Sequence, residues 1–249
     1  MKIIFIVIVV LGLIFFVKMN KNQIEENVSQ VSVVPISHAS MVLNWDGMTV
    51  YTDPVGEAKV FEGLAIPDLI LLTDIHGDHL DVEALKTVTK AQTIIVAPQA
   101  VADEIPEELK PQVLVMNNGE VLDHAGFKIE AIPMYNLPES PTSYHLKGRG
   151  NGYVVERGDK RVYISGDTAG IPEMRNLIGI DLAFVAMNLP YTMGVEEAAD
   201  AVLAFKPGAV YPYHYRTPEG FSDVAKFKQI VNAGNKEVEV IQLEWYPAP

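Results

Sequence analysis

The chain has 249 residues, no cysteine and a formal net charge of −13, from 19 Lys and Arg against 32 Asp and Glu. This length suits one large domain or two small ones, and a content of 49% hydrophobic and 20% charged residues is typical of a globular protein, not a disordered one. The acidic balance argues against nucleic-acid binding, because clustered Lys and Arg drive that binding. The absence of cysteine excludes disulfides, thiolate zinc sites and cysteine nucleophiles.

Residues 3–17 form an unbroken apolar run between Lys2 and Lys18. As a helix this run would span roughly 22 Å, which is short for a membrane core but right for the apolar region of a signal peptide. No small-x-small cleavage site follows, so an uncleaved membrane anchor and a cleaved signal are both open, with a buried N-terminal helix as a third reading. Residues 1–30 are therefore interpreted as a signal or anchor with a polar linker, and we expect residues 31–249 to lie outside the cytoplasm.

The first half of residues 31–249 opens with a hairpin signal. Residues 41–45 and 48–52 flank Asp46-Gly47, a favoured two-residue turn. Further along, the pattern predicts strands at 69–72 and 93–97, a helix over 81–88 with Leu85 facing inward, and a short helix over 101–109 that Pro106 must interrupt or restart.

The second half repeats this organisation. The pattern predicts a strand at 127–132, a long loop at 134–151, a hairpin of 153–156 and 161–165 around Gly158-Asp159, a strand at 182–187, a helix over 195–205 and a strand at 209–211. Hairpins in each half, combined with alternating strands and helices, indicate mixed β-sheets covered by helices. No internal repeat is present, so residues 31–249 are predicted to form one α/β domain.

The segment from Thr73 to Asp81 carries the densest group of potential metal ligands. It follows a predicted buried strand and precedes a helix, and alternation directs Asp74, His76 and Asp78 to one side, while the turn brings His79 beside them. Histidine nitrogen and aspartate oxygen form the mixture of ligands that zinc, manganese and iron accept. Gly77 allows the close approach of backbone that such crowding needs.

Three further candidate ligands lie past strands or in a loop. Asp167 stands in Gly166-Asp167-Thr168 just after the strand at 161–165, and His214 follows the strand around Val210. His145 lies in the long loop at 134–151. Such positions are where binding and catalytic residues concentrate.

Taken in order, D-x-H-x-D-H, then a histidine, then Gly-Asp-Thr, then a last histidine resembles the signature of the metallo-β-lactamase superfamily. The resemblance is closest to its lactonase-like and phospholipase-like hydrolases and runs from about Val33 to about Tyr215. Supporting stretches are His38-Ala39-Ser40, Thr52-Asp53-Pro54, Tyr144 to Gly152 and Asn188-Leu189-Pro190-Tyr191-Thr192. The resemblance implies a four-layer αββα sandwich of two mixed β-sheets flanked by helices.

The resemblance also implies a ligand set. One divalent ion would be held by Asp74, His76 and His145, the other by Asp78, His79 and His214, with Asp167 bridging both. Zinc is the first expectation, with manganese and iron as alternatives. Asp74 departs from the superfamily pattern, which has histidine there. A carboxylate would favour oxygen-preferring ions; alternatively, the first ion binds weakly or not at all and Asp74 only caps a loop or helix.

Several other residues are candidates for the surroundings of the metal site. His38 is interpreted as a pocket residue or a hydrogen-bonded core histidine, Asp53 as a turn residue or an orienter of a ligand, and His124 as a solvated turn residue. Five residues flank the ligand loops and are candidates for the substrate pocket, with ordinary packing as the alternative: Tyr135, Asn136, Tyr191, Met193 and Arg216.

The function that this resemblance implies is metal-dependent hydrolysis. A hydroxide held by two divalent ions would attack a carbonyl carbon or a phosphorus, with Asp78 and Asp167 as the catalytic carboxylates. We expect an ester, lactone or amide bond in a small or lipid-like molecule. The alternatives are a phosphodiesterase of the phospholipase D type, and a non-catalytic metal-binding relative whose first site has degenerated at Asp74.

Overall fold

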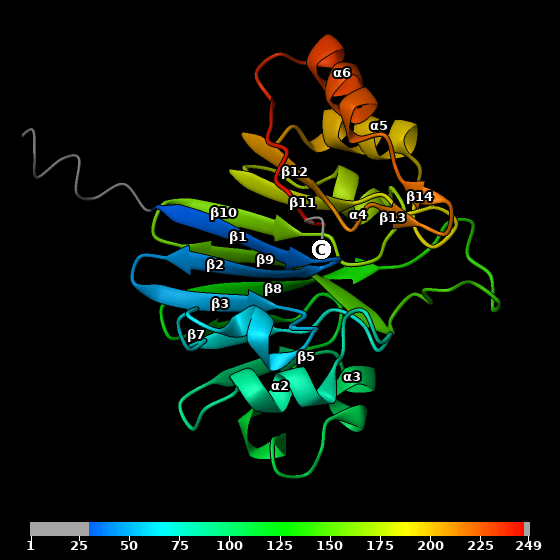
Figure 1. The fold of residues 1–249 in the computed structure, drawn as a ribbon. Helices are drawn as coiled ribbons and strands as arrows, with labels where there is room; N and C mark the ends of the chain where they lie inside the picture. The colour runs from blue at the N-terminus through cyan, green and yellow to red at the C-terminus, as the bar shows by residue number, and fades with distance from the viewer. Residues whose placement is uncertain (1–29, 247–249) are drawn as a thin grey trace, which may run out of the picture.

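Two β-sheets face each other in the computed structural model, which describes residues 30–246 (Figure 1). The interpretation of residues 1–30 as a signal or anchor thus lies outside the described residues, apart from Gln30. The first sheet has the spatial order β1 (Val31–Ser37), β2 (Ser40–Trp45), β3 (Met48–Thr52), β4 (Leu69–Leu71), β5 (Ile94–Ala97) and β6 (Val113–Val115).

The second sheet has the spatial order β15-β12-β11-β10-β9-β8-β7. Its strands are β7 (Val121–His124), β8 (Phe127–Met134), β9 (Gly150–Arg157), β10 (Lys160–Ile164), β11 (Leu182–Ala186), β12 (Ala209–Tyr213) and β15 (Glu239–Val240). Both sheets are mixed. β3 to β6 run parallel in the first, and β10, β11, β12 and β15 run parallel in the second. A small hairpin, β13 (Arg216–Thr217) and β14 (Gly220–Phe221), stands apart.

Helices cover the outer faces of both sheets. Figure 1 shows α2 (Val82–Val88) and α3 (Gln99–Glu104) on the side of the first sheet, and α5 (Val195–Phe205) and α6 (Val224–Gly234) on the side of the second. The short helix α4 (Pro172–Arg175) and two 3₁₀ turns, η1 (Ala58–Phe61) and η2 (Lys110–Gln112), complete the described elements. The predicted αββα sandwich of mixed sheets is confirmed.

The apolar run at β4 illustrates how the layers are held together. Leu69 and Leu71 belong to the cluster between the sheets, whereas Ile70 and Leu72 pack with the residues of α2 and α3. A strand that is covered on both faces needs apolar residues at successive positions, which explains the absence of alternation. Across the interface, Trp45 of β2 contacts Phe127 of β8 with ring centroids 5.6 Å apart.

Some elements differ from the expectations. The helix expected over 101–109 is α3, which begins at Gln99 and ends at Glu104, because Pro106 disfavours helical backbone at the residue before it. The loop expected to run to residue 151 ends earlier, since β9 begins at Gly150 and pairs there with Met134. The elements that were not predicted are β1, β6, β7, β13, β14, β15, α4, α6 and the two 3₁₀ turns.

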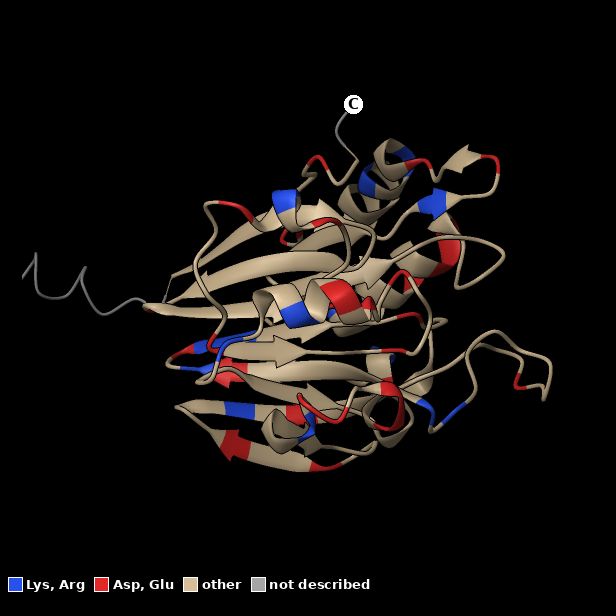
Figure 2. Ribbon diagram, turned by 60° about the horizontal axis from the view of Figure 1, so that its bottom comes forward, with Lys and Arg blue, Asp and Glu red and all other residues tan. Residues whose placement is uncertain are grey.

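The distribution of charge follows the layers. Figure 2 shows Asp, Glu, Lys and Arg mainly on helices, loops and strand ends, with little along the strands. Within residues 30–246, none of the helices combines the length and the apolar character that crossing a membrane would require.

Candidate metal centre

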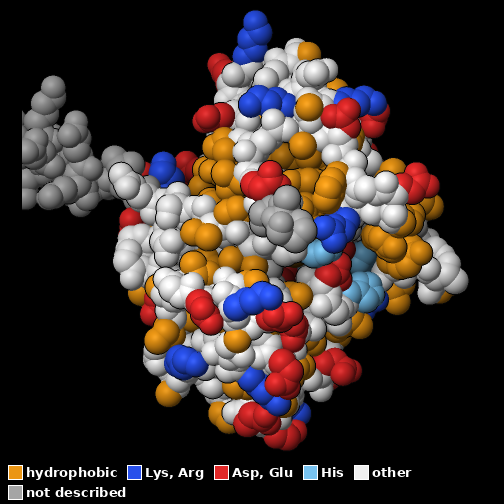
Figure 3. Space-filling model, in the orientation of Figure 1, with side chains coloured by type: hydrophobic (Ala, Val, Ile, Leu, Met, Phe, Trp, Pro, Cys, Tyr) orange, Lys and Arg blue, Asp and Glu red, His pale blue; other side chains and the backbone are white. Residues whose placement is uncertain are grey.

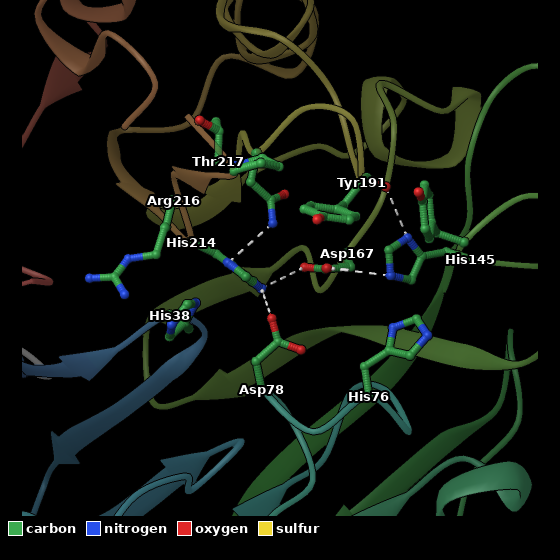
Figure 4. A pocket seen from close by; sticks show the side chains of 12 residues that line it. His38, His76, Asp78, His145, Asp167, Tyr191, His214, Arg216 and Thr217 are labelled. Atoms are coloured by element: carbon green, nitrogen blue, oxygen red, sulfur yellow. Dashed lines mark hydrogen bonds and ion pairs between the residues drawn. The ribbon is translucent and has the colours of Figure 1, made fainter. Parts of the chain in front are cut away.

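The predicted ligands converge at the ends of strands from both sheets. The loop after β4 supplies four of them, the β8–β9 loop one, and the segments after β10 and β12 one each: Asp74, His76, Asp78, His79, His145, Asp167 and His214. Five of the seven are buried, while His76 and Asp78 are 38% and 42% exposed. Figure 4 shows Asp78, His145, Asp167 and His214 pointing toward one another.

One group of ligand atoms lies around Asp74. Its Oδ2 is 2.7 Å from Nδ1 of His76 and 3.6 Å from Nε2 of His145. The second group lies around His214, whose Nε2 is 3.2 Å from Nε2 of His79 and 3.3 Å from Oδ2 of Asp78. The loops thus form two adjacent clusters of nitrogen and oxygen atoms.

Asp167 lies between the two clusters. Its Oδ2 is 3.4 Å from His145 Nε2, and its Oδ1 is 3.4 Å from Nε2 of both His79 and His214. One carboxylate therefore presents an oxygen to each cluster.

These residues fit divalent metal ions. Nε2 of His145 and Oδ1 of Asp167 are buried and have no hydrogen-bond partner. Buried polar atoms nearly always have a partner, so the unpaired atoms at the centre of the cluster indicate a ligand. Imidazole nitrogens with carboxylate oxygens suit zinc, manganese and iron.

The ionisation of these groups agrees with a cation site. Burial alone would raise the pKa of Asp167, but the charges of His214 and His79 hold it well below its usual value. Burial alone would lower the pKa of His79, yet Asp167 and Asp53 raise it well above its usual value. The centre of the cluster thus favours positive charge, as metal sites do. Burial lowers the pKa of His145, which favours the unprotonated ring that metal binding requires.

The other ring nitrogen of each buried histidine is also held. Nδ1 of His79 lies 2.9 Å from Oδ2 of Asp53, and Nδ1 of His145 lies 3.1 Å from the carbonyl of Tyr191. Nδ1 of His214 lies 3.3 Å from the side-chain amide of Asn188. Contacts to an oxygen acceptor, such as those of His79 and His145, orient metal-binding histidines.

The backbone is strained at the site. Of the six described non-glycine residues with positive φ, three lie here: His38 at 49°, Asp53 at 42° and His214 at 46°. Left-handed backbone at such residues persists only where the surrounding structure imposes it. The turns thus place these side chains at an energetic cost.

Arg149 is a residue that the sequence analysis missed. It precedes β9 and its guanidinium binds the carboxylate of Asp74, with Nε donating to Oδ1 over 3.2 Å and Nη2 donating to both oxygens over 3.1 Å. Its signal was present: a carboxylate at a buried position requires a counter-charge, and Arg149 stands in a stretch that supports the resemblance, four residues after His145.

A cavity of about 510 Å³ opens above the ligands. His38, Tyr191 and Arg216 line it, with His76, Asp78, Tyr144, His145, Asp167, Asn188, His214, Thr217 and Pro218. Figure 3 shows histidine side chains reaching the surface beside a group of hydrophobic side chains. Burial, followed by the charge of His214, lowers the pKa of His38 to about 4, so this side chain is neutral at pH 7.

Three pocket candidates do not line this cavity. Tyr135 is buried and its hydroxyl donates to Glu173. Asn136 accepts a hydrogen bond from the backbone N–H of His145, so it holds the ligand loop instead. Met193 is fully buried in the core. These three residues were predicted to line the pocket because they are close in sequence to a ligand loop, but closeness in sequence does not determine where a side chain points. His124 ends β7 and is half-buried.

Similarity to known proteins agrees with this geometry. The chain is 31% identical over 220 residues to a UPF0173 metal-dependent hydrolase of Methanopyrus kandleri, covering 84% of this chain and 95% of that protein. A crystal structure described as a metal-dependent hydrolase from Parabacteroides distasonis is 34% identical, with a TM-score of 0.78 and coverage of 89% and 96%. Igni18, a metallo hydrolase from Ignicoccus hospitalis, shares the fold with a TM-score of 0.71 at 23% identity, covering 86% and 94%.

The fold, the ligand cluster and these relatives define a metal-dependent hydrolase. Residues 33–214 match the family model of the beta-lactamase superfamily domain. The chain belongs to the metallo-β-lactamase superfamily.

Proposed function

We propose that this enzyme uses two divalent ions to hydrolyse an ester, lactone or amide bond of a small or lipid-like molecule. Zinc is the first candidate, and manganese and iron are the alternatives. The observation that carries the proposal is the position of Asp167, whose two oxygens face two separate clusters of ligands. A carboxylate in this place is suited to bridge two ions.

Asp74, His76 and His145 would hold one ion, and Asp78, His79 and His214 the other. Bound divalent ions would supply a nucleophile at neutral pH by lowering the pKa of water, and would polarise the substrate oxygen. Asp78 lines the cavity and is 42% exposed, so its carboxylate is placed to accept a hydrogen bond from a water molecule there. Asp78 and Asp167 are therefore the proposed catalytic carboxylates.

The cavity supports a partly apolar substrate. Tyr144, Tyr191 and Pro218 contribute to its wall, and Tyr144 is half exposed. The acidic chain does not favour nucleic acid.

A phosphodiesterase acting on headgroups is the second candidate, and Arg216 favours it. This side chain lines the cavity, and its guanidinium lies 4.7 Å from the ring centroid of Tyr246. A guanidinium matches phosphate oxygens in geometry and charge. An anionic group on the substrate would therefore find a partner at this wall.

Replacement of Asp167 by Ala tests the two-metal proposal. We expect wild-type protein to hold two ions per chain, and Asp167→Ala to lose both metal binding and hydrolysis, because neither cluster retains its shared oxygen. Metal content and turnover on lactones, esters, amides and phosphodiesters are the measurements.

The matched control is Asp123→Ala, which removes an exposed carboxylate and should change neither measurement. Retained activity in Asp167→Ala would contradict the proposal. Turnover of phosphodiesters alone would favour the second candidate. Less than one tightly held ion in wild-type protein, without turnover, would indicate a degenerate site.

A further inference from the structure

The pairing of Asp74 with Arg149 is unusual for its degree of burial. The Asp74 side chain is fully buried and that of Arg149 is only 19% exposed. Three hydrogen bonds from two nitrogens, Nε and Nη2, reach the two carboxylate oxygens, the fork-like contact that gives arginine–carboxylate pairs their geometric specificity. A buried carboxylate without such a partner is strongly unfavourable.

The backbone, and not only a long side chain, places Arg149 there. The N–H of Asn151 donates to the carbonyl of Thr73 over 3.0 Å. A Cβ atom at Gly150 would lie only 2.7 Å from that same carbonyl, so the chain passes directly against the residue before Asp74. The positions of Arg149 and Asp74 are thus linked through adjacent residues.

Asp74 lies between this arginine and the histidines of its cluster. Its Oδ1 accepts two bonds from Arg149, and its Oδ2 accepts one while lying 2.7 Å from His76 Nδ1 and 3.6 Å from His145 Nε2. The contact to Arg149 therefore fixes the carboxylate plane and directs Oδ2 toward the other two ligands.

We propose that Arg149 is a positioning residue of the metal centre, and that Asp74 and Arg149 together replace the neutral histidine of the superfamily motif. A histidine ligand adds no charge, and the aspartate adds one negative charge that the guanidinium offsets. The formal charge around the ions then equals that of a site with histidine. This inference rests on the proposed two-metal function, because Asp74 must bind an ion.

Zinc titration of metal-free, full-length protein tests the pair. The variants are Arg149→Met, Arg149→Lys, Asp74→His and the double variant Asp74→His/Arg149→Met. We expect Arg149→Met to weaken the binding of one of the two zinc ions by about 10- to 100-fold and to leave the other unchanged, the effect typical of lost support to a metal ligand. Arg149→Lys, which keeps the charge but loses the fork, should weaken it less.

The double variant carries the discriminating prediction. Asp74→His alone should bind the first zinc weakly, because Arg149 then faces a cation without its carboxylate. Asp74→His/Arg149→Met should bind it more tightly than either single variant. Arg161→Met is the matched control. It removes an arginine whose Nε lies 2.7 Å from Oε1 of Glu156 and that contacts none of the proposed ligands. This variant should leave both affinities unchanged.

Visible spectra of the cobalt-substituted proteins provide a readout besides affinity, since lost orientation of Asp74 should change the bands of one ion only. Circular dichroism and thermal melting of the metal-free variants check that they fold. If the double variant does not fold, the zinc affinities of wild type, Arg149→Lys and Arg149→Met still test the inference, and they should decrease in that order. Equal or tighter zinc binding in Arg149→Met would overturn the inference, since Arg149 would then be inert or a competitor of the ion. Fewer than two zinc ions in wild-type protein would instead contradict the two-metal function itself.

Discussion

Asp53 shows, at the scale of a single residue, how the centre is organised behind its ligands. Its carboxylate is fully buried, lies 2.9 Å from Nδ1 of His79, and accepts hydrogen bonds from the N–H and hydroxyl of Thr73 over 2.8 and 2.6 Å. Thr73 directly precedes Asp74. The same carboxylate therefore orients the ring of His79 and holds the start of the loop that carries four of the proposed ligands.

We expect Asp53→Asn to weaken zinc binding at the cluster of His79 by about 10- to 100-fold, because a carboxylate fixes the ring better than an amide. Titration of the metal-free protein measures this. Asp46→Asn is the matched control: Asp46 occupies the turn of the preceding hairpin with φ of 47°, and Asn-Gly suits such a turn as well as Asp-Gly. Equal affinity in the Asp53 and Asp46 variants would show that Asp53 does not support the ligand.

At the scale of an element, the loop between β8 and β9 carries both His145 and Arg149. Lys147, between them, donates to Glu173 over 2.9 Å and to the hydroxyl of Tyr135 over 3.2 Å. Its ammonium also lies 4.4 Å from the Tyr135 ring centroid. These contacts attach the loop to α4.

This attachment of the loop depends on pH in both the acidic and the alkaline range. Burial alone would raise the pKa of Glu173, but the bond from Lys147 holds it below the usual 4.5. The stabilisation is therefore present above pH 4.5 and is lost as the pH falls through the lowered value. The same bond raises the pKa of Lys147 above 10.5, so at alkaline pH the contact is lost only as the pH rises through the raised value.

We expect Lys147→Met to accelerate hydrogen exchange of residues 136–149 at pH 7 by up to about fivefold, since an ion pair that is largely exposed to solvent contributes only a small stabilisation. The difference from wild type should decrease as the pH falls below 4.5. Mass spectrometry of exchanged peptides measures it. A difference that stays constant across this range would show that the ion pair does not hold the loop.

At the scale of the whole molecule, the apolar run of residues 3–17 and the acidic remainder suggest separate roles. We propose that the run directs export or anchors the chain, with the hydrolase domain outside the cytoplasm. A chain lacking residues 1–30 should keep its melting temperature and metal content and leave the membrane fraction after cell fractionation. A lowered melting temperature would indicate that the segment is part of the folded domain.

Much of the fold could be read from local patterns. The hairpin around Asp46-Gly47, the two-sided apolar strand at Leu69–Leu71 and the helix Val195–Phe205 follow from turn chemistry and apolar periodicity, which involve residues close in sequence. The short edge strands β6 and β15 were missed, because they pair with residues far away in the sequence. The edge strand β7 was also missed, although it forms a hairpin with β8 across Ala125-Gly126.

The sequence alone determined the class of site, since four of the proposed ligands lie within six residues of one loop and their order along the chain is distinctive. Tertiary structure decided which groups support them. Arg149 and Asp74 are 75 positions apart, and Asp53 and His79 are 26 apart. The types of the ligand residues can be read from a short stretch of sequence. The groups that neutralise and orient them come from distant positions, and they become neighbours only when the two sheets pack together and bury the site.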